Sequence, residues 1–266
     1  FVNAAGCMTL LAVYPFTPFR GSWIYTAMGS APAGAQGIRD ALDIQLQRNM
    51  IPTEEDMQVV VLTGDGAANG IGMSSTSGAL ERDLDFLYVC YDNEGYGNTG
   101  QQYSAATPHG ARTSTSRVGI GFHGDKKPLF DIWVAHQPAY VATVIGAEPL
   151  DLARKIEKAK ELKGPRLIIA LSPCPTGWDF DPEEAVNIGK LAVKTGIWPL
   201  KEYVDGEVVH TKVPKKRLPV ERYLETQGRF RHLFEPERNE GVLAEIQGRV
   251  DAYWASVSPS PALPRR

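Results

Sequence analysis

Two residues with metal-binding side chains each follow an apolar run of this sequence. Asp65 lies in the turn Gly64-Asp65-Gly66, directly after an apolar run that begins at Val59. Asn93 follows a second apolar run, Phe86 to Cys90. A carboxylate and an amide oxygen suit Mg²⁺, which usually keeps phosphate oxygens and water in its shell. Because the glycines also let backbone amides approach a diphosphate, we predict a magnesium–diphosphate site.

The segment from Val59 to Gly100 must bring these two ligands together. Its two apolar runs flank a helix-length stretch of small residues that ends near Leu80, a pattern that predicts a βαβ unit. The crossover makes the two strands parallel, so residues just past their carboxyl ends meet in one crevice. The intervening helix would present its positive N-terminal end to the diphosphate.

The rest of the chain is typical of one large α/β domain. Helical spacing or capping signals predict helices at 31–49, 127–136, 152–162 and 181–194. Further strands are predicted near the start of the chain, at 140–145 and at 166–171, with a hairpin at 198–209. We expect an open parallel sheet with helices on both faces over residues 1–257, including a C-terminal helical part of two pieces from 220 to 257. Residues 258–266 are predicted to be a disordered tail.

Two segments lack regular periodicity, and one of them is polar whereas the other is rich in proline and aromatic residues. Residues 101–117 are rich in Ser, Thr and Gly and are too long for an ordinary connection, which favours a functional loop. Residues 14–19 alternate prolines with aromatic side chains, and we expect this loop to be buried against other parts of the structure.

Bulk composition excludes several classes of protein. The net charge of -3 gives no electrostatic basis for nucleic-acid binding, and no apolar run approaches the length of a membrane span. Three cysteines are too few for a disulfide scaffold and odd in number, so we expect a reducing compartment, the cytoplasm. The chain starts with Phe1, as if inside a β-run, and we expect the natural protein to begin earlier.

Three motifs of the central part of the chain occur together in one known family. They are Gly64-Asp65-Gly66, the segment from Asp92 to Gly100, and Ala106-Thr107-Pro108. With them the sequence resembles the β subunit of 2-oxoacid:ferredoxin oxidoreductases, the pyruvate synthase family. Further similar segments, in the same order, cover nearly the whole chain: Ala4 to Cys7, Tyr14 to Thr17, Tyr140 to Ala142, the Cys174 turn, Pro219 to Leu224 and Gln227 to Phe230.

This resemblance implies a site for thiamine diphosphate and Mg²⁺. Asp65, the Asn93 side chain and the Gly95 carbonyl would bind the metal. Asn98 would lie beside the thiazolium ring and the substrate carbonyl, in a catalytic role. The complete set of cofactor-binding residues that the resemblance implies is Gly64, Asp65, Gly66, Ala67, Asn93, Gly95, Gly97, Asn98 and Thr99.

The resemblance also gives two cysteines a role. In this family a four-iron four-sulfur cluster is bound by an upstream Cys-x-x-Cys pair and by cysteines at the positions of Cys7 and Cys174. Four thiolates are the normal complement of such a cluster, and this sequence supplies two of them. We therefore expect the natural subunit to have an N-terminal extension with two more cysteines.

The activity that the resemblance implies is the oxidative decarboxylation of a 2-oxoacid with coenzyme A to an acyl-CoA and CO₂. The 2-oxoacid would be pyruvate or another acid such as phenylglyoxylate, and electrons would pass to ferredoxin or a similar acceptor. The family's α subunit supplies the glutamate that activates the cofactor and most of the substrate pocket, and γ and ferredoxin-like δ subunits or their equivalents complete the enzyme. We expect this chain alone to be inactive.

Other interpretations remain open at the level of sequence. A non-redox thiamine diphosphate decarboxylase or carboligase would keep Asp65 and Asn93 but need no cluster, and a non-catalytic scaffold would have lost the cofactor. Asn98 can be an ordinary turn residue, because asparagine tolerates positive φ. Cys7 and Cys174 can be small buried hydrophobic residues, as we expect Cys90 to be. We assign none of the five histidines to a metal.

Overall fold

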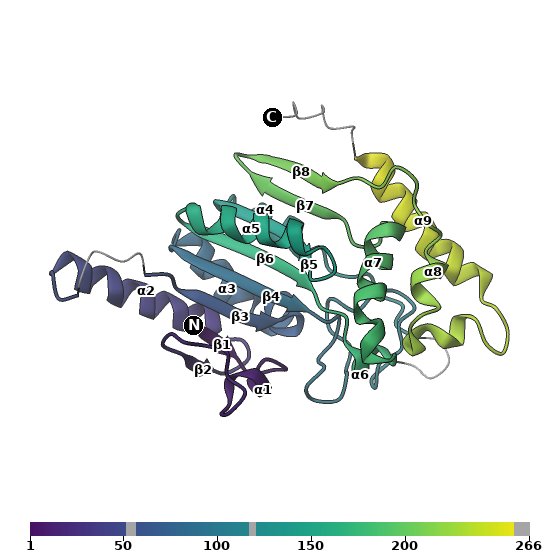
Figure 1. The fold of residues 1–266 in the computed structure, drawn as a ribbon, viewed down its shortest axis with the longest axis horizontal. Helices are drawn as coiled ribbons and strands as arrows, with labels where there is room; N and C mark the ends of the chain where they lie inside the picture. Colours follow the sequence, from purple (N-terminus) through teal and green to yellow (C-terminus); the bar gives the residue numbers. More distant parts are fainter. Residues whose placement is uncertain (52–56, 117–120, 258–266) are drawn as a thin grey trace.

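One eight-stranded sheet organises the part of the chain that the computed structural model describes, residues 1–51, 57–116 and 121–257 (Figure 1). Its strand order is β2-β1-β3-β4-β6-β5-β7-β8. The strands are β1 (Val2–Ala4), β2 (Ile24–Thr26), β3 (Val60–Gly64), β4 (Phe86–Asp92), β5 (Tyr140–Ile145), β6 (Pro165–Leu171), β7 (Leu200–Val204) and β8 (Glu207–Lys212).

The first six strands in this order are parallel, as predicted, and the last two are antiparallel. β7 runs opposite to β5, and β8 returns beside β7 through the two-residue turn Asp205-Gly206, where both residues have positive φ. This is the backbone geometry that a tight hairpin requires. The predicted hairpin is thus confirmed, and it makes one end of the sheet mixed rather than purely parallel.

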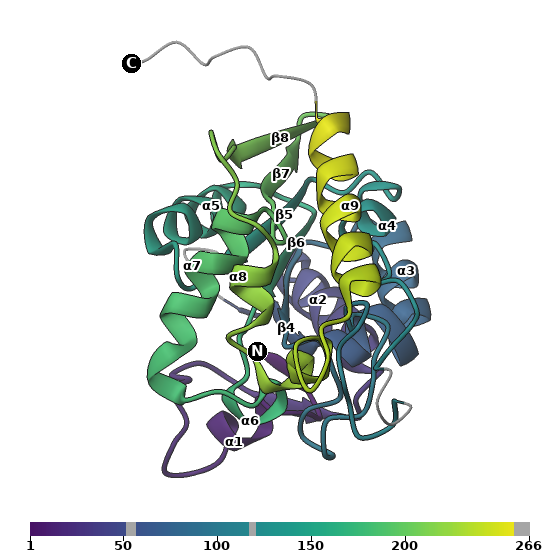
Figure 2. The same ribbon diagram turned by 90° about the vertical axis from the view of Figure 1, so that its right-hand side faces the viewer.

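Helices cover both faces of the sheet, as predicted (Figure 2). Alternate residues of β4 point to opposite faces: Tyr88 belongs to the larger apolar core, and Leu87 belongs to the smaller one. The larger core lies under α2 (Ala31–Gln47), α3 (Met73–Glu81) and α4 (Leu129–Val134), and the smaller core lies under α5 (Pro149–Glu161). The remaining helical elements are α1 (Thr9–Ala12), η1 (Ala67–Ile71), α6 (Pro175–Trp178), η2 (Pro182–Glu184), α7 (Ala185–Thr195), α8 (Glu221–Leu224), η3 (Gly228–Leu233) and α9 (Glu240–Ser256).

Three local expectations need correction. The stretch after Gly66 is not one helix, because η1 is a π-helical turn in which Gly70 leaves the helical region, and α3 begins only at Met73. The C-terminal part contains three helical pieces, α8, η3 and α9, instead of two. The aromatic loop at 14–19 is not buried within this chain, since Tyr14 is 91% and Phe16 is 69% exposed.

Two other predicted segments lie partly or wholly outside the described residues. The polar loop forms no helix or strand over residues 101–116, as predicted, whereas its last residue, Arg117, lies outside the described part. The predicted tail at 258–266 also lies outside it. Within residues 1–51, 57–116 and 121–257, no helix is both long and apolar enough to cross a lipid bilayer.

The strand order decides where the predicted ligands meet. β1, β3, β4 and β6 are consecutive parallel neighbours in the sheet, so their carboxyl ends lie along the same edge. The residues that follow these four ends are Cys7, Asp65, Asn93 and Cys174, in that order along the edge. The fold therefore brings the turns that carry both predicted metal ligands and both predicted cluster cysteines to one edge of the sheet.

Candidate cofactor and metal site

A pocket at this sheet edge gathers most of the predicted cofactor-binding residues. It is lined by the turns that follow β1, β3 and β4, with Met28 and Tyr91 completing its wall. Of the residues expected at the cofactor, it includes Gly64, Gly66, Ala67, Asn93, Gly95, Gly97, Asn98 and Thr99, together with Cys7. The remaining predicted ligand, Asp65, is buried between Gly64 and Gly66.

Asp65 is a buried carboxylate with little to balance its charge. Only 1% of the residue is exposed, and its Oδ2 accepts a hydrogen bond from the Ser104 hydroxyl. Burial, reinforced by the nearby Asp92 carboxylate, raises the pKa of Asp65 to about 8, although the Ser104 hydroxyl, the more distant Lys126 charge and the Gly95 N–H favour the charged form. A divalent cation would supply the missing positive charge.

The Asn93 amide presents one atom to two oxygens at once. This atom lies 2.7 Å from Asp65 Oδ1 and 2.9 Å from the Gly95 carbonyl oxygen. With the amide nitrogen in this place, it donates a hydrogen bond to both oxygens. With the amide oxygen there, three oxygen atoms converge without a hydrogen between them, and the amide nitrogen instead donates to Cys7 Sγ at 3.5 Å. The second orientation fits a hard cation such as Mg²⁺.

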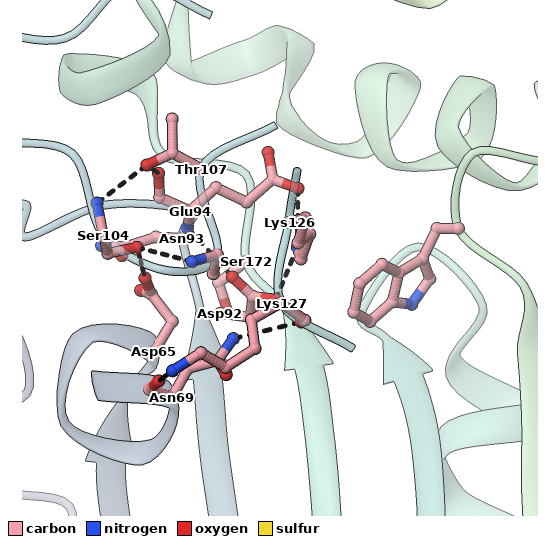
Figure 3. Close-up of polar contacts among 12 residues, drawn as sticks. Asp65, Asn69, Asp92, Asn93, Glu94, Ser104, Thr107, Lys126, Lys127 and Ser172 are labelled. Carbon is pink, nitrogen blue, oxygen red and sulfur yellow. Dashed lines mark hydrogen bonds and ion pairs between the residues drawn. The ribbon is translucent and has the colours of Figure 1, made fainter. Parts of the chain in front are cut away.

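The residues on both sides of Asn93 are fixed by buried ion pairs (Figure 3). Lys126 Nζ lies 2.7 Å from Asp92 Oδ2 and 2.8 Å from Glu94 Oε1, and Arg229 Nη2 lies 2.7 Å from Glu94 Oε2. Burial alone would raise the pKa of Glu94, but the two cations outweigh it and hold that pKa below its usual value. Glu94 is therefore a charged structural residue and not a free acid.

At two positions of the site, neighbouring side chains lie so close to the backbone that only glycine fits. A side chain at Gly66 would overlap the Tyr96 ring, whose hydroxyl donates to the Gly66 carbonyl at 3.1 Å. A Cβ at Gly97 would lie 3.1 Å from Cys7 Sγ and 2.9 Å from the Asn93 amide nitrogen. We predicted that glycines beside Asp65 admit a diphosphate. In this structure the Tyr96 ring occupies the space at Gly66.

Of the two predicted cluster cysteines, Cys7 lines the pocket, whereas Cys174 lies outside the lining but close enough to Cys7 for an electrostatic interaction. Both are half-buried, and Cys174 Sγ accepts a hydrogen bond from the Gly177 N–H at 3.3 Å. Burial raises the pKa of the Cys7 thiol, and the neighbouring Cys174 raises it further. Cys90 is fully buried inside β4, as expected for a core residue. Asn98 and Thr99 are exposed at the pocket rim, where a ligand or another subunit can reach them.

Sequence reasoning missed several residues that support the site. Ser104 and Lys126 come from the long connection between β4 and α4, whereas Trp178 and Arg229 come from distant helical elements. Lys127 also joins two segments, because its Nζ donates to the Asn69 carbonyl at 2.8 Å (Figure 3). Only the length and polarity of the connection, and the similarity of the segment that contains Arg229 to one family, pointed toward these positions.

Among the described residues, no three His, Cys, Asp or Glu side chains are grouped as metal ligands. The candidate metal site depends instead on one carboxylate, one amide and one backbone carbonyl. This set leaves octahedral Mg²⁺ with positions for diphosphate oxygens and water.

Comparisons with known proteins agree with this geometry. Residues 4–170 match the family described as thiamine pyrophosphate enzyme, C-terminal TPP binding domain. The chain is 43% identical to pyruvate synthase subunit PorB of Methanocaldococcus jannaschii, over 94% of this chain and 83% of the relative. It is 39% identical to the PorB subunit of Pyrococcus furiosus, over 99% of this chain and 83% of that subunit.

Two further comparisons widen the range of relatives. The ketoisovalerate oxidoreductase subunit VorB of Pyrococcus abyssi is 38% identical over 87% of this chain and 76% of its own length. A solved 2-oxoglutarate:ferredoxin oxidoreductase from Magnetococcus marinus shares the fold, with a TM-score of 0.54 and 20% identity over 97% of this chain and 81% of that chain.

The raised pKa of Asp65 predicts that metal binding releases a proton. We expect a preformed magnesium–diphosphate complex to displace about one proton at pH 7, because a carboxyl group with a pKa of about 8 is mostly protonated there and must ionise to bind metal. At about pH 9, above this pKa, the release should approach zero. Calorimetric titrations in buffers of different ionisation enthalpy count the protons. Equal release at both pH values would contradict the role of Asp65.

Proposed function

We infer the activity of this chain from its family: it belongs to the pyruvate synthase family of thiamine pyrophosphate-dependent 2-oxoacid:ferredoxin oxidoreductases, as a PorB-type β subunit. We propose that it binds thiamine diphosphate and Mg²⁺ for the oxidative decarboxylation of a 2-oxoacid with coenzyme A. The products are an acyl-CoA and CO₂, and ferredoxin or a similar protein accepts the electrons. Pyruvate is the first substrate to test, because the PorB relatives are named pyruvate synthase subunits.

One observation carries this proposal: four consecutive strand ends bring Cys7, Asp65, Asn93 and Cys174 to one edge of the sheet. A diphosphate site alone needs only the two central strand ends. The cysteines on both sides, together with the interaction between Cys7 and Cys174, add sulfur ligands beside the cofactor pocket. This combination favours a redox enzyme over a non-redox decarboxylase.

In the proposed site, Asp65, the Asn93 amide oxygen and the Gly95 carbonyl would hold Mg²⁺. The backbone around Gly64, Gly66 and Ala67 would face the diphosphate once the Tyr96 ring leaves its place beside Gly66. When bound, thiamine diphosphate supplies the electron sink for the decarboxylation of 2-oxoacids. The protein supplies position and charge. The turn at Gly97, Asn98 and Thr99 lies at the pocket rim, where the exposed Asn98 amide can orient the reactive ring and the substrate carbonyl.

Electron removal is the proposed task of Cys7 and Cys174. We propose that their thiolates bind two irons of a four-iron four-sulfur cluster, which needs four thiolates in total. Cys90 is fully buried within β4, so the other two thiolates come from cysteines outside these 266 residues. None of the three cysteines forms a disulfide, which supports work in a reducing compartment such as the cytoplasm.

The proposed enzyme also needs partner subunits. The glutamate next to the metal ligand, Glu94, is bound to Lys126 and Arg229 and is not available to activate the cofactor. We propose that an α subunit contributes this acid and most of the substrate pocket, and that γ and ferredoxin-like δ subunits or their equivalents carry the electrons onward. The exposed Asn98 and Thr99 leave room for such a partner at the pocket rim.

Loss of the Asp65 carboxylate should remove the cofactor. We expect Asp65→Ala to lower the affinity for magnesium thiamine diphosphate by about 100-fold or more, since a direct metal ligand is lost. Quantifying thiamine diphosphate and Mg²⁺ in the supernatant of denatured enzyme measures this directly. Asp40→Ala, an exposed carboxylate on α2, is the matched control and should keep both. Retention of both ligands by Asp65→Ala would exclude the proposed metal site.

The cysteines distinguish the redox enzyme from its alternative. In anaerobically purified enzyme, Cys7→Ser or Cys174→Ser should strongly reduce the broad visible absorption and the iron content assigned to the cluster at this site, because each removes a ligand. Cys90→Ala should leave both unchanged, since Cys90 lies in the core. If neither serine variant changes iron content or absorption, this chain binds no cluster and the non-redox alternative is favoured.

Partner dependence predicts that the purified chain has no turnover by itself. Addition of the α partner should produce coenzyme A-dependent reduction of ferredoxin or a viologen dye by pyruvate. A panel with 3-methyl-2-oxobutanoate and phenylglyoxylate, compared by kcat/KM, identifies the preferred acid. Turnover without the partner would show that the activating acid lies in this chain.

A further inference from the structure

We propose that Trp178 and Arg229 are positioning residues that hold the Asn93 metal ligand and join its turn to the Cys174 turn. This inference rests on the proposed function, because it concerns how the same site is supported. Neither residue lines the cofactor pocket, and both are buried. The Trp178–Arg229 pair therefore acts through the residues that it contacts.

Trp178 contacts the metal-ligand turn directly. Its side chain is fully buried, and its indole Nε1–H donates to the backbone carbonyl of Asn93 at 2.8 Å. This carbonyl belongs to the peptide that joins Asn93 to Glu94. A hydrogen bond at this point fixes the plane of that peptide and, with it, the direction in which the Asn93 side chain leaves the backbone.

Arg229 holds both Trp178 and the next residue of the turn. Its guanidinium carbon lies 3.9 Å from the centre of the Trp178 ring, and its Nη2 donates to Glu94 Oε2 at 2.7 Å. The Arg229 Nε–H donates to Gln227 Oε1 at 2.9 Å, so the guanidinium has partners on two sides. A planar guanidinium can stack on a ring and pair with a carboxylate at the same time, whereas a lysine ammonium cannot reproduce both contacts.

The turn needs this support because of its backbone. Glu94 has a φ of 61°, in the left-handed region that a non-glycine residue adopts only when its surroundings impose it. Trp178 holds the peptide before Glu94, and Arg229 and Lys126 hold its side chain. Without them, the turn can relax toward a more common conformation and move Asn93 away from Asp65.

The same tryptophan also belongs to the Cys174 turn. Cys174 directly precedes α6, its Sγ accepts from the Gly177 N–H, and its carbonyl accepts from the Trp178 N–H at 2.8 Å. Trp178 is the last residue of α6. A displacement of Trp178 thus changes the position of Cys174 and the carbonyl contact to Asn93 together. We expect one substitution here to affect both the metal and the sulfur ligands.

Trp178→Phe in the assembled enzyme tests this inference. Phenylalanine keeps a ring under Arg229 but removes the N–H donor to Asn93. We expect the Mn²⁺ or Mg²⁺ concentration for half-saturation, at saturating thiamine diphosphate, to rise about tenfold, as for other residues that orient metal ligands. The electron paramagnetic resonance spectrum of bound Mn²⁺ should change its linewidth, which a general loss of stability would not cause.

Trp254→Phe is the matched control. Trp254 is also buried, and its Nε1–H donates to the backbone carbonyl of Gly196 at 2.9 Å, away from the ligand turn. The Trp254→Phe variant loses the same kind of hydrogen bond, an indole N–H to a backbone carbonyl, and should bind metal as tightly as the wild-type enzyme does. If Trp178→Phe fails to fold, Arg229→Lys takes its place, with an expected loss of about fivefold because the charge remains without the stacked geometry.

The outcomes separate this inference from the proposed function. Wild-type enzyme that binds no magnesium thiamine diphosphate would overturn the proposed function itself. Wild-type binding with equal metal affinity and Mn²⁺ spectra in Trp178→Phe or its substitute Arg229→Lys would overturn the positioning role alone. Weaker binding in Trp254→Phe of the same size would also overturn it, since the effect would then reflect general stability.

Discussion

The parallel alignment of β1, β3, β4 and β6 is the constraint on which the whole site depends. Each strand ends in a short turn that cannot reach far from its own strand, so the ligands meet only if the four strands are direct neighbours with the same direction. Backbone hydrogen bonding within the sheet sets these spacings before any ligand binds. The chemistry of the edge therefore follows from strand order, and the connecting helices serve to impose that order.

Two buried carboxylates at this edge, Glu94 and Asp65, have different partners, and their pKa values shift in opposite directions. Glu94 is matched by Lys126 and Arg229, so burial does not prevent its ionisation, and it works as a fixed part of the scaffold. Asp65 accepts a hydrogen bond from Ser104 but forms no ion pair with any described residue, and burial raises its pKa even though the nearby Lys126 charge favours the ionised form. Lys126 and Arg229 thus pair with Glu94 and support the turn, whereas the Asp65 carboxylate would be neutralised by a bound metal ion.

Much of the site could be predicted from the sequence, because its ligands follow apolar runs and glycine turns that are visible locally. The strands and the shared edge of Asp65 and Asn93 follow from such signals, whereas Cys7 and Cys174 were assigned to the site by the family resemblance and their order along the edge comes from the structure. The contacts of Trp178 and Arg229 with the ligand turn could not be predicted, since they span 85 and 135 residues of sequence. The break at Gly70 and the exposed Tyr14 were also missed, because both depend on packing that local patterns do not encode.

The Asn93 side chain carries a hydrogen-bond donor and an acceptor on one rotatable amide group. When the nitrogen faces inward, it saturates Asp65 and the Gly95 carbonyl, and no buried oxygen is left facing another. Mg²⁺ at this point would be held with the amide turned, so that its oxygen faces the ion together with Asp65 Oδ1 and the Gly95 carbonyl oxygen. The metal would thus replace two hydrogen bonds of this side chain with coordination by its oxygen, and only a group with both an amide nitrogen and an amide oxygen serves in both arrangements.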